Sequence, residues 1–307
     1  MDLFGLILLD VIAPVFVLMG AGVVLHRIFN LHLATLSKLL TYFFIPVVAF
    51  VNVYESRITG EIFFEILITQ VVFAAVMIGV SAGMSRALRL DRGRDANLKN
   101  SIVLINSGNF GIPVSQLVFQ GQPIGVTVQV FVMLIQNFIT YTYGLFNSIS
   151  VRHSGSKAVF EFLKMPVLYA LVLGYVLKAM KLDLPFFVME PISRSADAFL
   201  AVALLTLGAQ VAFIRLRELN KVIIASCIGR LLIGPAVSLG IILLMGLDGV
   251  VAQALFIASA FPSSRNSAQL ALEYDNHPEL AAQIVLVTTV LSAVTVTIVV
   301  YLSGIIF

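Results

Sequence analysis

The feature that most constrains this chain is a series of apolar runs, each about as long as a helix must be to cross a bilayer. Ten such runs lie near residues 5–27, 36–55, 62–86, 98–120, 123–147, 159–180, 194–214, 221–246, 250–273 and 279–305. Only 11% of the 307 residues are charged, against roughly a quarter in soluble domains, so a soluble fold would lack the polar residues to cover its surface. The sequence predicts an all-α integral membrane protein with ten transmembrane helices.

The charges between these runs predict an orientation. The loops after the first, third, fifth and seventh runs carry basic clusters, whereas those after the second, fourth and eighth runs carry few basic residues. Loops rich in Lys and Arg stay in the cytoplasm. We therefore expect a multi-pass protein of the inner or plasma membrane with both termini outside the cytoplasm, although the loop before the last run has no Lys or Arg and follows only by parity. The net charge of +3 is too small to indicate a nucleic-acid partner.

The second half of the chain echoes the first. The stretch PVFVLMGAGVVL from Pro14 and the stretch PVLYALVLGYVL from Pro166 share five residues at the same spacing, a shift of 152 residues. The pair Gln116–Leu117 recurs as 269–270 with nearly the same shift. A unit of five spans has odd parity, so its copy lies upside down in the membrane. We expect two inverted five-helix repeats, residues 1–150 and 151–307.

Two of the runs contain residues that interrupt a helix, LINSGNFGIP at 104–113 and FPSSRNS at 261–267. Proline removes an amide donor, and glycine allows the chain to leave helical angles. In hydrocarbon, the freed backbone groups must be buried in protein or line a wet cavity. Breaks at repeat-related positions predict a midplane site, where half-helix N-termini attract an anion. The alternative is that proline and glycine only kink these helices.

These motifs carry a resemblance to a known family. NSGNFGIPVSQLVF at 106–119 and FPSSRNSAQLALEYDNHPELAAQIVLVTTVLSAVT at 261–295 resemble the auxin efflux carrier family. That family includes the plant auxin exporters and bacterial permeases for malate and malonate, and the lack of a long central loop is similar to the bacterial members. In the plant exporters an asparagine and a proline at the first break serve the substrate carboxylate; the matching residues here are Asn109 and Pro113. The crossing proline of the second break corresponds to Pro262.

The resemblance also implies an architecture. It is that of the bile-acid/sodium symporters, with helices 4 and 9 broken and crossing near the substrate. Spans 1, 2, 6 and 7 would form a scaffold through which a homodimer assembles. Spans 3–5 and 8–10 would form a transport domain.

Arg265, just after the second break, is a candidate for substrate contact. A charged residue inside a span usually marks a functional site, and a guanidinium matches a carboxylate with two parallel hydrogen bonds. The alternative is an ion pair with Glu273 or another internal acid. Arg230, nine residues into the eighth run, is expected to extend towards the cytoplasmic face, as long basic side chains do; contact with the substrate is the alternative.

Neutral polar residues near the breaks provide further candidates, either as substrate ligands or as hydrogen bonds between helices. Asn52 is expected to face the cavity from the scaffold side. The expected substrate-binding set is Asn106, Asn109, Gly111, Pro113, Pro262, Ser263, Ser264, Arg265, Asn266, Gln129, Gln136, Asn137 and Asn52.

The sequence shows no metal-ligand pair, nucleophile elbow or phosphate-binding loop, so we expect no cofactor and no enzyme. Four acids, Asp10, Glu65, Asp197 and Glu273, lie near the ends of spans and identify no coupling residue, which leaves a proton or sodium open as the coupling ion. The expected function is a secondary transporter of a small organic anion, auxin-like or malate/malonate-like, working by elevator-like alternating access. A transporter-like sensor or channel, or a membrane-embedded enzyme, are the alternatives.

Overall fold

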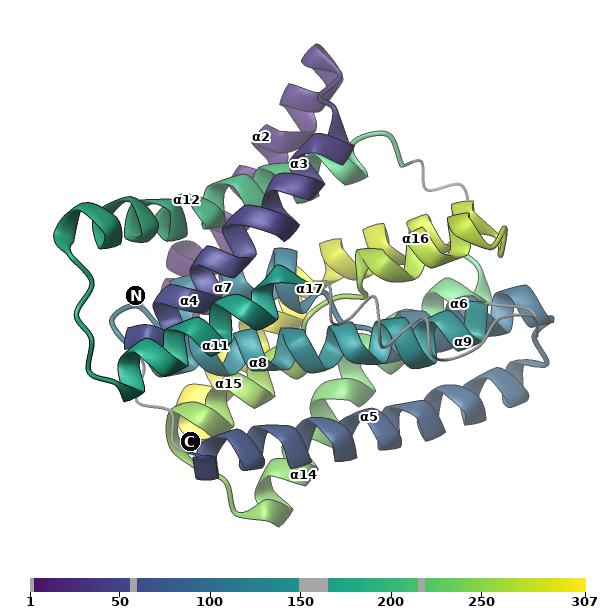
Figure 1. Ribbon diagram of the computed structural model, residues 1–307. Helices are drawn as coiled ribbons and strands as arrows, with labels where there is room; N and C mark the ends of the chain where they lie inside the picture. The colour runs from purple at the N-terminus through teal and green to yellow at the C-terminus, as the bar shows by residue number, and fades with distance from the viewer. Residues whose placement is uncertain (1–2, 56–59, 149–164, 215–218) are drawn as a thin grey trace.

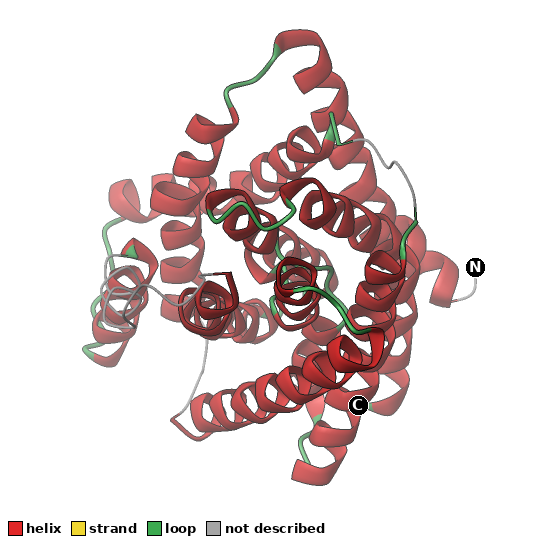
Figure 2. Ribbon diagram, turned by 90° about the vertical axis from the view of Figure 1, so that its right-hand side faces the viewer, coloured by secondary structure: helices red, strands yellow, loops and turns green. Residues whose placement is uncertain are grey.

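The computed structural model describes residues 3–55, 60–148, 165–214 and 219–307. Within these ranges the chain forms helices joined by short loops and no strand (Figures 1 and 2). Seven helical stretches there are long and apolar enough to cross a membrane: Gly5–Phe29, Leu33–Glu55, Gly60–Leu88, Pro123–Ser148, Phe186–Val211, Lys221–Met245 and Pro278–Ile306. The prediction of an all-α, multi-pass membrane protein is confirmed at this level.

Several of the long stretches combine α-helices with a π-helical turn. The elements are α1 (Leu3–Ile7), η1 (Leu8–Ile12), α2 (Ala13–Phe29), α3 (Leu33–Leu39), η2 (Leu40–Phe44), α4 (Ile45–Glu55), α5 (Gly60–Leu88), α6 (Arg92–Val103), η3 (Ser107–Gly111), α7 (Ile112–Val118), α8 (Pro123–Ile139), η4 (Thr140–Gly144), α9 (Leu145–Ser148), α11 (Pro166–Ala179), α12 (Phe186–Val211), α13 (Lys221–Cys227), η5 (Ile228–Ile233), α14 (Gly234–Met245), α15 (Gly249–Ser259), α16 (Arg265–Glu273) and α17 (Pro278–Ile306). The runs predicted at 98–120 and 250–273 are each two helices with a break between them. The run predicted at 159–180 lies partly outside the described residues.

Short polar side chains cap the N-termini of four of the described helices, α6, α13, α15 and α16. Asp91 accepts a hydrogen bond from the backbone N–H of Arg94 at 3.1 Å, which caps α6 and holds the pKa of the Asp91 carboxyl below its usual value. Asn220 caps α13 in the same way, and Gly246 ends α14 in the left-handed conformation. These helix ends are therefore set by the local sequence, and they lie in the polar loops between the apolar runs.

One part of the molecule is a four-helix group (left and top in Figure 1). It consists of α2 with the preceding α1 and η1, α4 with the preceding α3 and η2, α11 and α12. Helices α2 and α12 cross so closely that their backbones touch. A Cβ atom at Gly22 would lie 2.0 Å from the carbonyl oxygen of Leu205, and one at Gly208 would lie 1.9 Å from that of Met19. Only glycine fits at both positions, because a side chain would need the space that the opposite backbone occupies.

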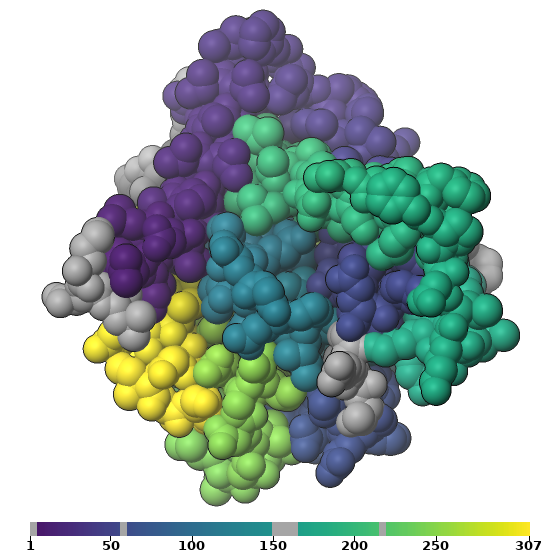
Figure 3. Space-filling model, turned by 90° about the vertical axis from the view of Figure 1, so that its left-hand side faces the viewer, coloured from purple at the N-terminus to yellow at the C-terminus, as the bar shows by residue number. Residues whose placement is uncertain are grey.

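The remaining helices, α5–α9 and α13–α17, form a crossing group whose apolar interior contains several hydrogen-bonded polar side chains. The hydroxyl of Ser101 on α6 donates to that of Ser226 on α13 at 2.8 Å, and the Asn100 amide donates to the carbonyl of Gly144 at 3.0 Å. Such bonds link helices where apolar contacts alone do not favour association over lipid. Segments from both halves of the chain lie side by side on the surface in Figure 3, so neither half forms a separate body.

Replacing Gly22 by valine tests the contact between α2 and α12. The added side chain would overlap the opposite backbone, so we expect Gly22→Val to lower the free energy of unfolding by about 1–3 kcal/mol or more. Thermal unfolding of the purified protein in detergent measures the change. Gly20→Val is the matched control, because a Cβ atom at Gly20, on the same helix, meets nothing within 4 Å. Equal stability of the two variants would contradict the contact.

Candidate functional site

The two interrupted stretches have the same form. Helix α6 ends at Val103, residues 104–106 are not helical, and η3 and α7 continue from Ser107. Helix α15 ends at Ser259, residues 260–264 are not helical, and α16 begins at Arg265. Each stretch therefore contributes one helix C-terminus and one helix N-terminus to the interior of the molecule.

The two unwound segments pair with each other as a short antiparallel bridge. The backbone N–H of Asn106 donates to the carbonyl of Pro262 at 2.9 Å, and the N–H of Ser264 donates to the carbonyl of Leu104 at 2.8 Å. Unwinding a helix in an apolar setting leaves backbone groups that cost several kcal/mol each if unpaired. The bridge satisfies four of these groups and fixes the register of one break against the other.

Side chains satisfy further backbone groups around the bridge. The Ser263 hydroxyl donates to the carbonyl of Ser101 at 2.7 Å, and the Ser263 N–H donates to the Thr288 hydroxyl at 3.2 Å. The side-chain oxygen Oε1 of Gln136 accepts a hydrogen bond from the backbone N–H of Ile105 at 3.3 Å. The polar side chains of this region thus stabilise the unwound segments, and some of them, such as Gln136, also line the adjacent cavity.

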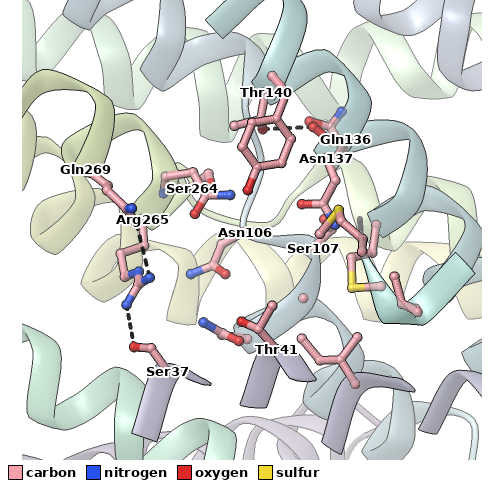
Figure 4. A pocket seen from close by; sticks show the side chains of 18 of the residues that line it. Ser37, Thr41, Asn106, Ser107, Gln136, Asn137, Thr140, Ser264, Arg265 and Gln269 are labelled. Carbon is pink, nitrogen blue, oxygen red and sulfur yellow. Dashed lines mark hydrogen bonds between the residues drawn. The ribbon is translucent and has the colours of Figure 1, made fainter. Parts of the chain in front are cut away.

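A cavity of about 240 Å³ lies beside the bridge (Figure 4). Its walls come from α3 and η2 on one side and from the two breaks, α8, η4 and the start of α16 on the other. The lining residues are Ser37, Lys38, Thr41, Tyr42, Ile45, Ile105, Asn106, Ser107, Gly108, Asn109, Met133, Gln136, Asn137, Thr140, Tyr141, Met165, Val167, Ser264, Arg265, Asn266 and Gln269. The cavity therefore lies between the four-helix group and the crossing group.

Seven of the expected site residues line this cavity: Asn106, Asn109, Gln136, Asn137, Ser264, Arg265 and Asn266. Six others do not: Gly111, Pro113, Pro262, Ser263, Gln129 and Asn52. Gln129 is fully buried and donates to the Ser107 carbonyl at 3.0 Å. The Asn52 amide donates to the Val48 carbonyl of its own helix at 2.8 Å, so it does not face the cavity as expected.

Two buried amide groups in the wall carry N–H donors without an acceptor among the described residues. They are Nδ2 of Asn106 and Nε2 of Gln136, and the side chains are only 5% and 2% exposed. Figure 4 shows the Asn106 amide in the middle of the cavity. A buried donor without a partner costs about 1–3 kcal/mol, so this wall suits a ligand that only accepts hydrogen bonds, as a carboxylate does.

Arg265 lies at the start of α16 and reaches across the cavity. Its Nη1 donates to the Ser37 hydroxyl on α3 at 2.9 Å, and its Nη2 donates to Oε1 of Gln269 at 3.3 Å (Figure 4). Among the described residues no carboxylate lies within 4 Å of the guanidinium, so the alternative of an ion pair with Glu273 is not observed. Arg265 thus brings to the cavity a positive charge that is held by neutral partners alone.

The helix ends at the cavity add to this positive character. The first turn of η3 contributes residues 106–109 to the wall, and the first turn of α16 contributes residues 264–266. The N-terminus of a helix presents free N–H groups and about half a positive charge. Both breaks therefore direct their positive ends to the same space.

Several residues that line the cavity were not predicted from the sequence. The α3–η2 wall contributes Ser37, Lys38 and Thr41, and α16 adds Gln269. Ser37 and Thr41 are four residues apart, as Arg265 and Gln269 are, so each pair shares one face of its helix. That spacing could have found them, because a polar pair four residues apart in an apolar helix indicates a face turned away from lipid.

An apolar groove of about 710 Å³ adjoins the cavity and shares Ser37, Arg265 and Gln269 with it. The groove runs between α3, the C-terminal end of α12, α16 and the start of α17. The start of α17, which lines the groove, lies close to α6, because the Asn97 amide on α6 donates to the carbonyl of Asn276, just before α17, at 2.8 Å. Arg265 stands where cavity and groove meet.

Gly111 tests how tightly the two breaks pack. A Cβ atom there would lie 2.6 Å from Nε2 of Gln129 and 2.6 Å from the ring of Phe261. We expect Gly111→Ala to destabilise the protein by about 1–3 kcal/mol, as overpacking does, measured by thermal unfolding. Gly108→Ala is the control: its nearest neighbour, the Met133 sulfur, would be 3.4 Å away, and alanine favours helix. A loss of stability at Gly108 and none at Gly111 would refute this packing.

Comparison with known proteins is consistent with this geometry. The sequence profile of a family described as "Membrane transport protein" matches residues 7–162 and 148–300. The chain is 23% identical over 266 residues to an uncharacterized transporter of Methanothermobacter thermautotrophicus, an alignment that covers 85% of this chain and 86% of that protein. The chain therefore belongs to the membrane transport protein family, the auxin efflux carrier family that its broken-helix motifs resemble.

Proposed function

We propose that this protein is a secondary carrier that moves a small organic anion across the membrane by alternating access. The anion binds in the cavity beside the bridge between the two breaks. The observation that carries the proposal is the gathering of donors and positive charge around this space. The Asn106 and Gln136 amides each have an N–H without an acceptor among the described residues, the Arg265 guanidinium has only neutral partners there, and two helices begin at the cavity wall. A carboxylate suits such a site, because it accepts hydrogen bonds and carries a negative charge.

The charges at the cavity favour a dicarboxylate over a monocarboxylate. The volume of about 240 Å³ has room for a small organic anion of either kind. Arg265 provides one cationic side chain, and Lys38, exposed at the rim on α3, provides a second. Two cations at one cavity match two carboxylates, so malate or malonate are the first compounds to test, with indole-3-acetate as the monocarboxylate comparison.

The helix packing supports two inverted repeats. Gly22 of α2 meets the backbone of α12, and the repeat-related Gly174 of α11 would place a Cβ atom 3.0 Å from the Phe50 carbonyl of α4. The same kind of glycine contact therefore occurs at corresponding places in the two halves. In this arrangement the four-helix group is the scaffold, and the crossing group is the transport domain that carries the anion.

The bond between Arg265 and Ser37 supports movement of one group against the other. It is one of the side-chain hydrogen bonds that join the crossing group to the four-helix group, at 2.9 Å; the Thr127 hydroxyl on α8, which donates to the Asn52 carbonyl on α4 at 3.0 Å, forms another. An anion that takes over the guanidinium would release this link. The groove beside it would then be the open side in this conformation, and the basic residues of the α5–α6 loop on the same face favour the cytoplasmic side.

Transport by the reconstituted protein is the test of this proposal. Liposomes containing the protein would be given labelled malate, malonate or indole-3-acetate, with and without imposed proton and sodium gradients. We expect saturable uptake that unlabelled anion on the opposite side accelerates, because a carrier must return its site. Binding without uptake would instead indicate a sensor, and uptake insensitive to anion on the opposite side would indicate a channel.

Arg265→Gln removes the proposed charge contact while keeping a polar side chain. A hydrogen bond to a charged group contributes about 1.5–3 kcal/mol, so the apparent affinity for the anion should fall by about ten- to a hundredfold. The apparent affinity of Arg265→Lys should lie between those of the wild type and Arg265→Gln, because lysine keeps the charge without the planar fork. Uptake over a range of anion concentrations measures the change.

The matched control is Arg194→Gln. Arg194 is an exposed arginine of α12 that pairs with Glu190 at 2.9 Å and does not line the cavity. Its substitution should leave uptake unchanged. An Arg265→Gln protein that takes up anion as the wild type does would remove Arg265 from the site.

A further inference from the structure

Arg230 is the largest fully buried side chain in the described part of the molecule, and the proposed anion cavity does not use it. It lies in η5, in the middle of the stretch from Lys221 to Met245, and it is 0% exposed. The expectation that it extends towards the cytoplasmic face is therefore wrong. A charge held at such a depth needs a compensating partner, because removing an ion from water costs several kcal/mol.

The partners of Arg230 are the C-terminal ends of the two broken helices. Its Nη1 donates to the carbonyl of Ile102, in the last turn of α6, at 2.7 Å. Its Nη2 donates to the carbonyl of Ser259, the last residue of α15. The guanidinium also lies 5.6 Å from the ring centroid of Phe73. One side chain thus joins the two helix ends that lie behind the bridge.

The chain leaves room for this contact. A Cβ atom at Gly234, one turn further along, would lie 2.7 Å from Nη2 of Arg230, so the glycine permits the guanidinium to reach Ser259. The carbonyls in the last turn of a helix have no partner within that helix. Arg230 therefore satisfies groups that each break would otherwise leave unpaired in the interior.

The charges also balance. Among the described residues no carboxylate lies within 4 Å of Arg230. The C-terminus of a helix carries about half a negative charge, so two of them together offer about one unit to oppose the guanidinium. The protein thus sorts its four internal helix ends, with the two positive ends at the cavity and the two negative ends on Arg230.

We infer that Arg230 is a built-in cation of the helix crossing, a positioning residue that holds both breaks in register for anion binding. The inference rests on the proposed function for its role in transport. Because a covalently attached charge already neutralises the two helix C-termini, the crossing has no need of a bound sodium or other metal ion there. The bridge then fixes the positions of Asn106 and Ser264, whose backbone N–H groups form its hydrogen bonds and which line the cavity.

Thermal unfolding without any substrate is the first test. We expect the wild type to unfold at the same temperature in sodium chloride and in choline chloride of equal concentration, because a specifically bound sodium ion would raise that temperature. Arg230→Met, which keeps a long side chain without charge, should unfold at a temperature lower by roughly 10 °C. Arg230→Lys should unfold at a temperature between those of the wild type and Arg230→Met, because lysine keeps the charge but lacks the fork that reaches both carbonyls. Stabilisation of the wild type by sodium, or an Arg230→Met protein as stable as the wild type, overturns the inference.

Chemical rescue separates charge from shape. Arg230→Ala leaves a space that methylguanidinium can fill, and N-methylurea has nearly the same shape without the charge. We expect methylguanidinium to raise the unfolding temperature of Arg230→Ala and N-methylurea not to do so. Equal rescue by both compounds, or by neither, overturns the role of the charge. Met77→Ala, which opens an apolar space in the core cluster that also contains Phe73, is the control that methylguanidinium should not rescue.

Uptake measurements connect this residue to transport. In liposomes where the wild type accumulates labelled malonate, Arg230→Ala should lose at least nine-tenths of the uptake and regain it with methylguanidinium but not with N-methylurea. Uptake by Arg230→Ala equal to that of the wild type overturns the positioning role. If the wild type accumulates none of the three anions, the proposed function fails, whereas the unfolding experiments still decide whether Arg230 is the built-in cation.

Discussion

The antiparallel bridge between residues 104–106 and 262–264 is the constraint on which the rest of the structure depends. Without it, each unwound segment would leave peptide groups unpaired in an apolar interior, and both helices would be expected to close up. Because each segment supplies the partners of the other, neither break is stable alone. The pairing also explains why serines and glutamines gather here: Ser263 and Gln136 satisfy the backbone groups that two short segments cannot satisfy between themselves.

Breaking two helices at the same place creates four internal termini, and their opposite polarities decide what each side of the crossing can hold. Arg230 lies at the negative termini, while Arg265 lies at one of the positive ones, with only neutral partners among the described residues. The first arginine donates to two carbonyl oxygens, and the second lines a cavity where a negatively charged molecule has space. Two residues of the same type therefore have different tasks because of the helix ends that face them.

The fold could be predicted from the sequence to the extent that its causes are local. Apolar length sets the long helices, and the prolines and glycines set the breaks, within a few residues of the observed ends. The cavity wall was only half predicted, because a polar residue in a membrane helix can turn to a neighbour, as Asn52 does to its own backbone. The depth of Arg230 was missed for a related reason: its partners are carbonyl groups of helices distant in sequence, and carbonyl groups leave no mark in the pattern of residue types.

The close crossing of α2 and α12 at Gly22 and Gly208 has a consequence for motion. The two backbones are in direct contact and no flexible side chain lies between them, so we expect α2 and α12 to move together as one rigid unit. In the proposed carrier, the movement that exposes the cavity to the other side of the bilayer would have to keep this backbone contact intact. The two groups would then move against each other where α3 and α4 face α8 and α16, because flexible side chains meet there and can change neighbours.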